Sequence, residues 1–238
     1  MRVRYGGSWT AAWSSKTGSS ALMETMRSFL IPIALSLACG AHAAPPQRLE
    51  IHYEVTHNGM AIAEVTERFE HDRRQYRAEE LWKGKGVFAL RGDARRMSRG
   101  VIASDGLRPA EFEDKRPGRE VRRLTFDGPD KVPALQRQDR LSLMWNFAFA
   151  PPKADVTVRV TDEKGNESTH VYQIKGRERV RVPAGEFDAL RVARKHDQPD
   201  KRATEIWFAT EQSYLPVKIM IDRDGARSEQ VAVRINAQ

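Results

Sequence analysis

Apolar and polar side chains alternate along most of the chain beyond residue 48, which is the pattern of β-strands with one buried face. The segment from Leu49 to Val55 gives the clearest example, because every second residue in it is apolar. Asn58-Gly59 follows, a strong signal for a two-residue hairpin turn. The other segments expected to form strands are 62–70, 75–82, 95–102, 110–115, 120–126, 156–161, 169–174, 177–182, 204–209, 215–221 and 229–235, with one more that begins near residue 187.

The turn Pro183-Ala184-Gly185 is the best-defined feature of the pattern, and valines alternate with arginines just before it. Proline cannot donate to a strand ladder and glycine tolerates a positive φ, so both residues should end the strand. Phe187 is out of phase with the apolar residues after it, so we expect a β-bulge near Ala189. We predict a hairpin in which Pro183, Gly185 and Phe187 have a structural role.

One segment, Gln138–Ala150, has apolar residues at helical spacing instead of at every second position. Asp139 can cap its first turn, and Pro151-Pro152 ends it. The short run Val87–Leu90 fits either a helical turn or the start of a strand.

About a dozen strands at hairpin spacing, with one helix, indicate antiparallel pairing and not alternating βαβ units. We therefore predict an all-β, mainly antiparallel fold, a barrel or strongly curved half-barrel sheet with one short covering helix. The same pattern also fits a sandwich of two sheets, and it does not define an oligomeric state.

Four short stretches follow one another in the chain: Tyr53-Glu54-Val55 with Asn58-Gly59, Asp105-Gly106-Leu107-Arg108-Pro109, the turn from Pro183 to Leu190, and Leu215-Pro216-Val217. In that order and spacing, the chain from Leu49 to Ile235 resembles an exported bacterial family known as domain of unknown function 3108. The resemblance implies export and a β-rich fold. It implies no activity, so function has to be argued from the residues.

The first part of the chain has a different composition. Residues 1–25 are rich in Gly, Ser, Thr and Ala without an apolar period, so we expect a disordered or untranslated extension. Residues 26–43 have a basic start at Met26-Arg27, an apolar run too short to span a bilayer, and a small-x-small site that ends at Ala43. This layout of a secretory signal predicts initiation at Met26 and cleavage after Ala43. The mature protein would be one periplasmic β-rich domain, 44–238, without a transmembrane span.

Cys39 is the only cysteine of the sequence, and it lies inside this signal. A lipoprotein signal normally has leucine three residues before the acylated cysteine, but this chain has Ser36 there, so the pattern does not favour lipidation. Cleavage after Ala43 removes the thiol. A disulfide, a thiol nucleophile and a cysteine metal site are then excluded from the mature chain.

The formal charge of the chain is +8, of which residues 1–43 supply +3. The remaining excess suits an anionic surface of the cell envelope. Nucleic acid is not an expected partner, because the protein is predicted to be exported.

No catalytic motif accompanies these patterns. The five histidines after residue 43 show neither His-x-His nor His-Glu-x-x-His spacing, so we predict no metal site. The chain has no Gly-x-Ser-x-Gly elbow, and Gly84-Lys85-Gly86 lacks the spacing of a phosphate-binding loop. We therefore predict no cofactor and name no catalytic residue; a hydrolase with an atypical site stays as an alternative.

Two groups of apolar side chains lie outside the regular strands, around a glycine-flanked connection and on the predicted helix. They can pack together as core, or they can enclose an apolar ligand site with basic residues near it. The residues of this candidate ligand site are Trp82, Phe88, Leu90, Met144, Trp145 and Phe147.

A row of arginines, Arg177, Arg179 and Arg181, would stand on one face of a strand. Such a row can bind phosphate or carboxylate groups. It can equally be a solvated face whose arginines pair with glutamates on neighbouring strands.

These observations favour a non-enzymatic protein that binds a hydrophobic or amphiphilic molecule of the envelope, such as a lipid. The first alternative is an envelope structural or assembly protein that binds another protein through a sheet edge. A pocket lined by the aromatic residues would favour the first hypothesis, and a filled interior with an exposed edge strand would favour the second.

Overall fold

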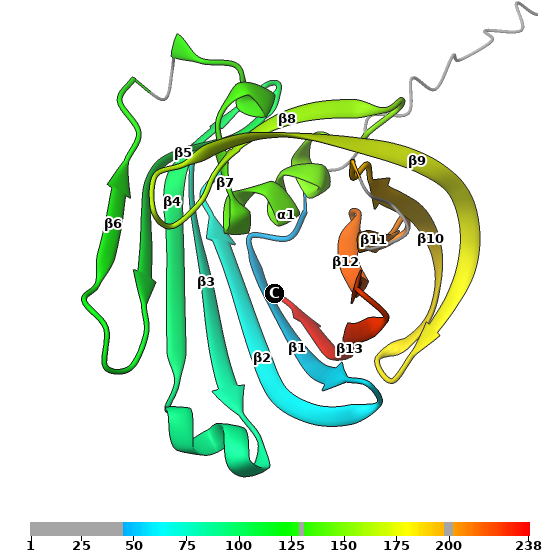
Figure 1. The fold of residues 1–238 in the computed structure, drawn as a ribbon. Helices are drawn as coiled ribbons and strands as arrows, with labels where there is room; N and C mark the ends of the chain where they lie inside the picture. Colours follow the sequence, from blue (N-terminus) through cyan, green and yellow to red (C-terminus); the bar gives the residue numbers. More distant parts are fainter. Residues whose placement is uncertain (1–44, 129–130, 198–201) are drawn as a thin grey trace, which may run out of the picture. The chain divides into compact units, whose positions relative to one another are not determined.

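The computed structural model describes residues 45–128, 131–197 and 202–238, so the predicted extension and signal lie outside the described residues. The described residues form one sheet with 13 strands (Figure 1). In chain order these are β1 (Arg48–His57), β2 (Met60–His71), β3 (Gln75–Gly84), β4 (Ala94–Ala103), β5 (Gly106–Lys115), β6 (Arg122–Thr125), β7 (Gln138–Asp139), β8 (Val156–Thr161), β9 (Glu167–Val182), β10 (Gly185–Arg194), β11 (Arg202–Ala209), β12 (Leu215–Arg223) and β13 (Ala226–Ala237).

The strands follow the order β6-β5-β4-β3-β2-β1-β13-β12-β11-β10-β9-β8-β7. Every pair is antiparallel except β7 with β8, so the predicted all-β, mainly antiparallel fold is confirmed. The hydrogen-bonded order has two ends, β6 and β7, and the sheet is therefore not a closed barrel. Gln138 in β7 still reaches β5, because its side-chain amide donates to the carbonyl oxygen of Leu107 over 2.6 Å.

The helix α1 (Arg140–Phe149) lies within this sheet, with β1–β3 on one side of it and β11–β12 on the other (Figure 1). Asp139 caps it as predicted: its carboxylate accepts from the backbone N–H groups of Leu141 and Ser142, both over 2.8 Å. The other carboxylate oxygen of Asp139 accepts a hydrogen bond from Ser98 on β4 over 2.6 Å. Burial raises the pKa of this aspartate, and the bond to Ser98 joins the helix start to the sheet.

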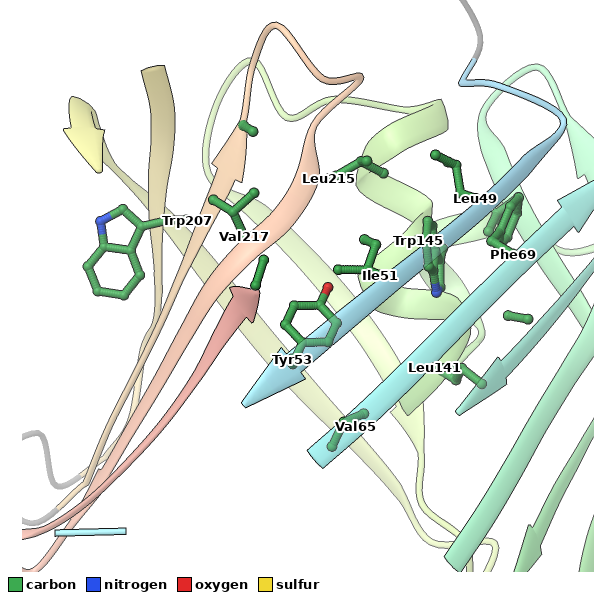
Figure 2. Packing of buried hydrophobic residues seen from close by; sticks show 14 of the residues in the cluster. Leu49, Ile51, Tyr53, Val65, Phe69, Leu141, Trp145, Trp207, Leu215 and Val217 are labelled. Carbon is green, nitrogen blue, oxygen red and sulfur yellow. The ribbon is translucent and has the colours of Figure 1, made fainter. Parts of the chain in front are cut away.

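The apolar core lies between α1 and the inner sheet face. Trp145 is fully buried and stacks on Phe69 of β2 with a centroid distance of 4.7 Å (Figure 2). On another side of α1, Phe147 meets Phe208 of β11 edge-on at 4.9 Å. The helix therefore fills one end of the space inside the sheet with side chains.

The central hairpin joins β9 and β10 through the predicted turn, and Gly185 has a φ of 144°, which favours glycine. The backbone N–H of Ala184 donates to the carbonyl oxygen of Ala232 over 3.0 Å, so the tip docks on β13 beyond the last residue that β12 pairs. The predicted bulge near Ala189 is wrong: the register shifts between Arg191 and Val192. The extra residue lies on β9, which runs unbroken where two strands, 169–174 and 177–182, were expected.

The undecided run Val87–Leu90 belongs to a 3-10 helix, η1 (Gly86–Arg91). η1 folds back onto the end of β3, and a Cβ at Gly84 would overlap the carbonyl oxygen of Phe88. Only glycine allows this close approach. The backbone N–H of Lys85 also donates to the carbonyl oxygen of Ile62 over 2.8 Å, which holds the start of η1 on β2.

Candidate functional site

A cavity of about 800 Å³ lies inside the sheet beside the start of α1. Its walls come from β1–β4 and η1, from the turn after β5, and from β12 and β13. This volume falls within the range of about 300–1,000 Å³ that is usual for small-molecule sites. The apolar side chains of the lining include Val55, Ile62, Trp82, Phe88, Ile219 and Ile221. The basic ones are Arg91, Arg96, Arg116, Arg119 and Arg140.

The apolar walls stand on strands that are distant in sequence. Ile219 and Ile221 on β12 pair with Gln230 and Ser228 on β13, and β13 pairs with β1. Trp82 stands at the end of β3, where η1 turns back over Gly84. The pairing of the first strand with the last therefore brings the two apolar walls together.

A row of ionisable side chains crosses the inner face of four neighbouring strands. Glu67, Glu80, Arg96 and Asp114 are direct cross-strand neighbours on β2, β3, β4 and β5. Arg96 forms ion pairs with Glu80 and with Asp114, the latter over 3.1 Å, and all three side chains are largely buried. Arg116 binds the second oxygen of Asp114 over 2.8 Å. Buried charges of this kind need such partners, because desolvation of an unpaired charge costs several kcal/mol or more.

Glu67 forms no ion pair with a residue in the described part of the chain, and a second carboxylate, Glu80, lies directly opposite it. Burial, and then repulsion by Glu80, raise the pKa of Glu67 to about 8. One oxygen of Glu67 accepts a long hydrogen bond from the cavity residue Gln230 at 3.4 Å, and the other is buried without a hydrogen-bond partner among the described residues. At neutral pH this side chain is mostly a neutral acid next to the cavity.

The basic residues of the cavity differ in how many carboxylates lie close enough to neutralise their charge. Arg96 and Arg116 each contact two carboxylates, Arg116 through Asp114 and Glu163. Arg140, the first residue of α1, is 3.8 Å from Glu80, and its side chain is half exposed. Arg91 and Arg119 are exposed at the cavity mouth. The cavity thus presents guanidinium groups that an anionic ligand can reach.

The structure places only part of the predicted ligand site at this cavity. Trp82 and Phe88 line it. Leu90 is 90% exposed on η1, because the 3-10 turn directs it to solvent. Trp145 and Phe147 are core residues, because α1 packs against the sheet with more than one face.

Met144 is likewise packed against the core and not at the cavity. The arginines of the cavity were not predicted as residues of the ligand site. Arg96 could have indicated them, because it occupies one position of an otherwise inward-facing series on β4.

The arginine row on β9 is exposed, and two of its members, Arg179 and Arg181, have cross-strand carboxylate partners. Arg179 is 3.2 Å from Asp188, and Arg181 is 3.1 Å from Glu186. Arg177 and Arg179 border a separate cleft that also contains Glu178 and Glu211. A solvated, paired sheet face describes this row, and anion binding by it remains a prediction.

Two further contacts bear on chemistry in the part of the chain that is described. His57 Nδ1 lies 2.9 Å from the hydroxyl of Ser228, a residue of the cavity wall. Groups of three or more metal-ligating side chains are not found among the described residues. Within the same residues, helices are too short or too polar to cross a bilayer.

The fold and the cavity define a class of protein: an open antiparallel sheet around one helix, with a hollow of mixed apolar and basic lining beside it. The chain belongs to the family of proteins of unknown function DUF3108, whose model matches residues 48–228. This confirms the resemblance that the sequence indicated. No curated protein matches the chain.

Solved structures with a related arrangement of strands have little sequence in common with the chain. A beta-barrel-like protein of the family DUF1849 from Brucella abortus is 7% identical with a TM-score of 0.49, over 82% of this chain and 99% of that one. A Bacteroides fragilis protein with a YmcC-like fold, thought to be exported, is 12% identical with a TM-score of 0.39, over 81% and 97%. A Parabacteroides distasonis protein, thought to be a lipoprotein, is 12% identical with a TM-score of 0.36, over 81% and 97%.

Proposed function

We propose that this protein binds one amphiphilic molecule with an anionic group, without catalysing a reaction. The single observation that carries the proposal is the cavity, which combines apolar walls with five arginines. An apolar chain would lie between Trp82, Ile219 and Ile221, because burial of its methylene groups stabilises the complex by about 0.8 kcal/mol each. A carboxylate or phosphate would bind Arg140, with Arg119 near it, since guanidinium groups match these anions. In this proposal the curved sheet acts as a half-barrel that holds the ligand.

Binding can be measured by calorimetry with oleate, which is anionic, and monoolein, which has a similar chain but no charge. We expect Trp82→Ala to weaken both ligands, by roughly tenfold, because it removes a wall. Arg140→Gln should weaken oleate by a similar factor but leave monoolein unchanged. Native mass spectrometry of the purified protein should also show a retained amphiphile. If neither oleate nor monoolein binds and nothing is retained, the proposal fails.

We propose in addition that the protein is exported to the periplasm, because residues 26–43 have the layout of a secretory signal. The mature chain should then begin at Ala44. N-terminal sequencing of protein recovered from the periplasm tests this, and a mature form that retained Met1 would contradict it.

A hydrolase is the second candidate, and the contact between His57 and Ser228 at the cavity favours it. A serine next to an imidazole can act as a nucleophile with its base. His57 ends β1, directly before the turn at residues 58 and 59, and Ser228 lies opposite it on β13. The contact therefore joins the ends of two neighbouring strands. If the purified protein cleaves p-nitrophenyl esters and Ser228→Ala abolishes the activity, this candidate replaces the binding protein.

The assembly-protein alternative has less support from the sheet edges. Strand addition needs an exposed edge with several free backbone groups. Here the ends of the strand order are β6 with four residues and β7 with two. A partner strand would gain few hydrogen bonds at either edge.

A further inference from the structure

The large apolar side chains that are exposed are concentrated at one end of the sheet. Among the described residues six of them are exposed, and five of the six belong to segments around the cavity mouth. The most exposed are Leu90 at 90%, Val87 at 75% and Met60 at 67%. Val121 and Ile221 complete this set, which we call the apolar rim, and Val233 is the sixth residue and lies elsewhere on β13.

The antiparallel pairing explains why these residues share one end. β1 ends and β2 begins at the turn before Met60, and β3 ends next to them, since Gly84 pairs with Ala63. η1 follows β3 directly and supplies Val87 and Leu90. β5 ends, β6 begins and β12 turns into β13 at this same end, because each of these strands is antiparallel to its neighbour. Figure 1 shows η1 and the β1–β2 turn together at the lower end of the view.

The apolar rim is divided among separate segments of the chain: Met60 after the β1–β2 turn, Val87 and Leu90 on η1, Val121 before β6, and Ile221 near the end of β12. A protein partner normally covers a contiguous surface with matched shape. A bilayer interface instead accepts side chains that enter it individually, because the lipids adapt around each one. The distribution of the rim therefore suits a lipid surface better than a folded partner.

The charges at this end point to the same partner. Exposed basic residues surround the rim, while fewer exposed acidic residues do so, namely Glu64, Asp93, Glu120 and Asp224. Each basic residue close to an anionic bilayer contributes about 1 kcal/mol to binding at low salt. The exposed basic residues at this end are Lys83, Arg91, Arg119, Arg223 and Arg227.

We propose that the apolar rim docks the protein on the surface of a bilayer that contains anionic lipids, with the cavity mouth turned toward the membrane. Val87 and Leu90 of η1 enter the interface, and Arg91 and Arg119 lie near the lipid phosphates. Docking requires no ligand in the cavity. If the protein also binds an amphiphile as proposed above, the ligand would pass between bilayer and cavity without crossing water.

The test is flotation of the protein with phosphatidylcholine vesicles that contain or lack phosphatidylglycerol. We expect binding to the anionic vesicles that weakens as salt rises, since charges are screened over about 10 Å at 0.1 M salt. The double variant Val87→Asp with Leu90→Asp should partition at least roughly tenfold more weakly, because two apolar side chains are lost from the interface. Both side chains are exposed, so the fold is expected to be unaffected, and a melting curve checks this.

Two matched variants keep the docking proposal separate from the binding proposal. Val233→Asp introduces one aspartate, where the η1 double variant introduces two, at an exposed valine outside the rim, and it should leave flotation unchanged. Ile62→Trp fills part of the cavity, so it should abolish oleate binding while flotation stays as in the wild type.

Three results would overturn docking. The first is wild-type protein that does not float with anionic vesicles at low salt. The second is equal loss of flotation in Val233→Asp and in the η1 double variant. The third is a wild-type dimer in analytical ultracentrifugation that the η1 double variant dissociates, because the rim would then bind a second copy.

Discussion

Two tryptophans that face the interior of the same sheet have opposite surroundings. Trp145 is fully buried against Phe69 and is not among the residues that line the cavity. Trp82 is on β3, with β2, β1 and β13 between it and the β12 wall of the cavity, and it stays partly exposed and lines open space. We call these regions the filled end and the cavity end.

The difference arises from what the inner face of the sheet meets. At the filled end α1 supplies Leu141, Trp145 and Phe147, which complete the core. At the cavity end only the first residue of the helix, Arg140, reaches the space, and a polar row lies between the two ends. The helix fills one end of the interior with side chains, and the other end contains the cavity.

The largest expected effect concerns the filled end. Trp145→Ala should lower the free energy of unfolding by about 3–5 kcal/mol, because it leaves a cavity in a packed core. Trp82→Ala, at the cavity end, should cost far less, since its side chain already borders a hollow. Urea denaturation of both variants measures this. Equal losses would mean that both ends of the interior are packed alike.

The next effect concerns Glu67, between the two ends. The native state keeps this proton up to about pH 8, while the unfolded chain loses it near 4.5, so Glu67 lowers stability as pH rises through that interval. Glu67→Gln removes this penalty and should stabilise by on the order of 2–4 kcal/mol above pH 8, but by little at pH 4. Thermal melts across this pH range provide the measurement. A stability difference that does not depend on pH would show that Glu67 ionises normally.

A smaller effect is expected at the hairpin tip, outside both ends. Gly185→Val should destabilise by roughly 1–3 kcal/mol, because a φ of 144° is strained for any other residue. Pro183→Ala should cost less, since proline acts mainly through the unfolded chain. Urea melts compare the two variants, and oleate binding should be unchanged in both. Negligible shifts in both melts would contradict a special role for this turn.

The smallest effect on stability is expected for Arg140→Gln. Its side chain is half exposed, and its nearest carboxylate oxygen is 3.8 Å away, so the melting curve should move within about 0.5 kcal/mol of the wild type. Oleate affinity should still fall, as described above. A large loss of stability would place Arg140 among the structural ion pairs together with Arg96.

Much of the fold could be predicted because local signals determine it. Alternation at 49–55, the Asn58-Gly59 turn and the Asp139 cap each depend on neighbouring residues, and each appears in the structure. The bulge was misplaced because Ala189 and Leu190 are both buried, on opposite faces of β10 and in different core clusters. A sequence pattern assumes one buried face, and here both faces of β10 are buried at these two residues.

The site was harder to predict, because it depends on pairing between distant strands. Trp82 and Phe88 were found from composition near a glycine-rich connection. Ile219 on β12 joins them only through the β13–β1 pairing, which no local pattern specifies. In the sequence, Arg96 and Asp114 look like ordinary charged residues of strands. Only the register of β4 with β5 shows that both side chains face inward together.

The pairing of β1 with β13 also has a consequence for how the chain acquires its fold. The strands that come first and last in the sequence, β1 and β13, are neighbours in the middle of the sheet. Residues near 50 therefore pair with residues near 235. Contacts of such long sequence separation make folding slow. Loss of the last strand would leave two half-sheets, each with a new unpaired edge open to aggregation. The centre of the sheet therefore depends on β13, the strand that the chain supplies last.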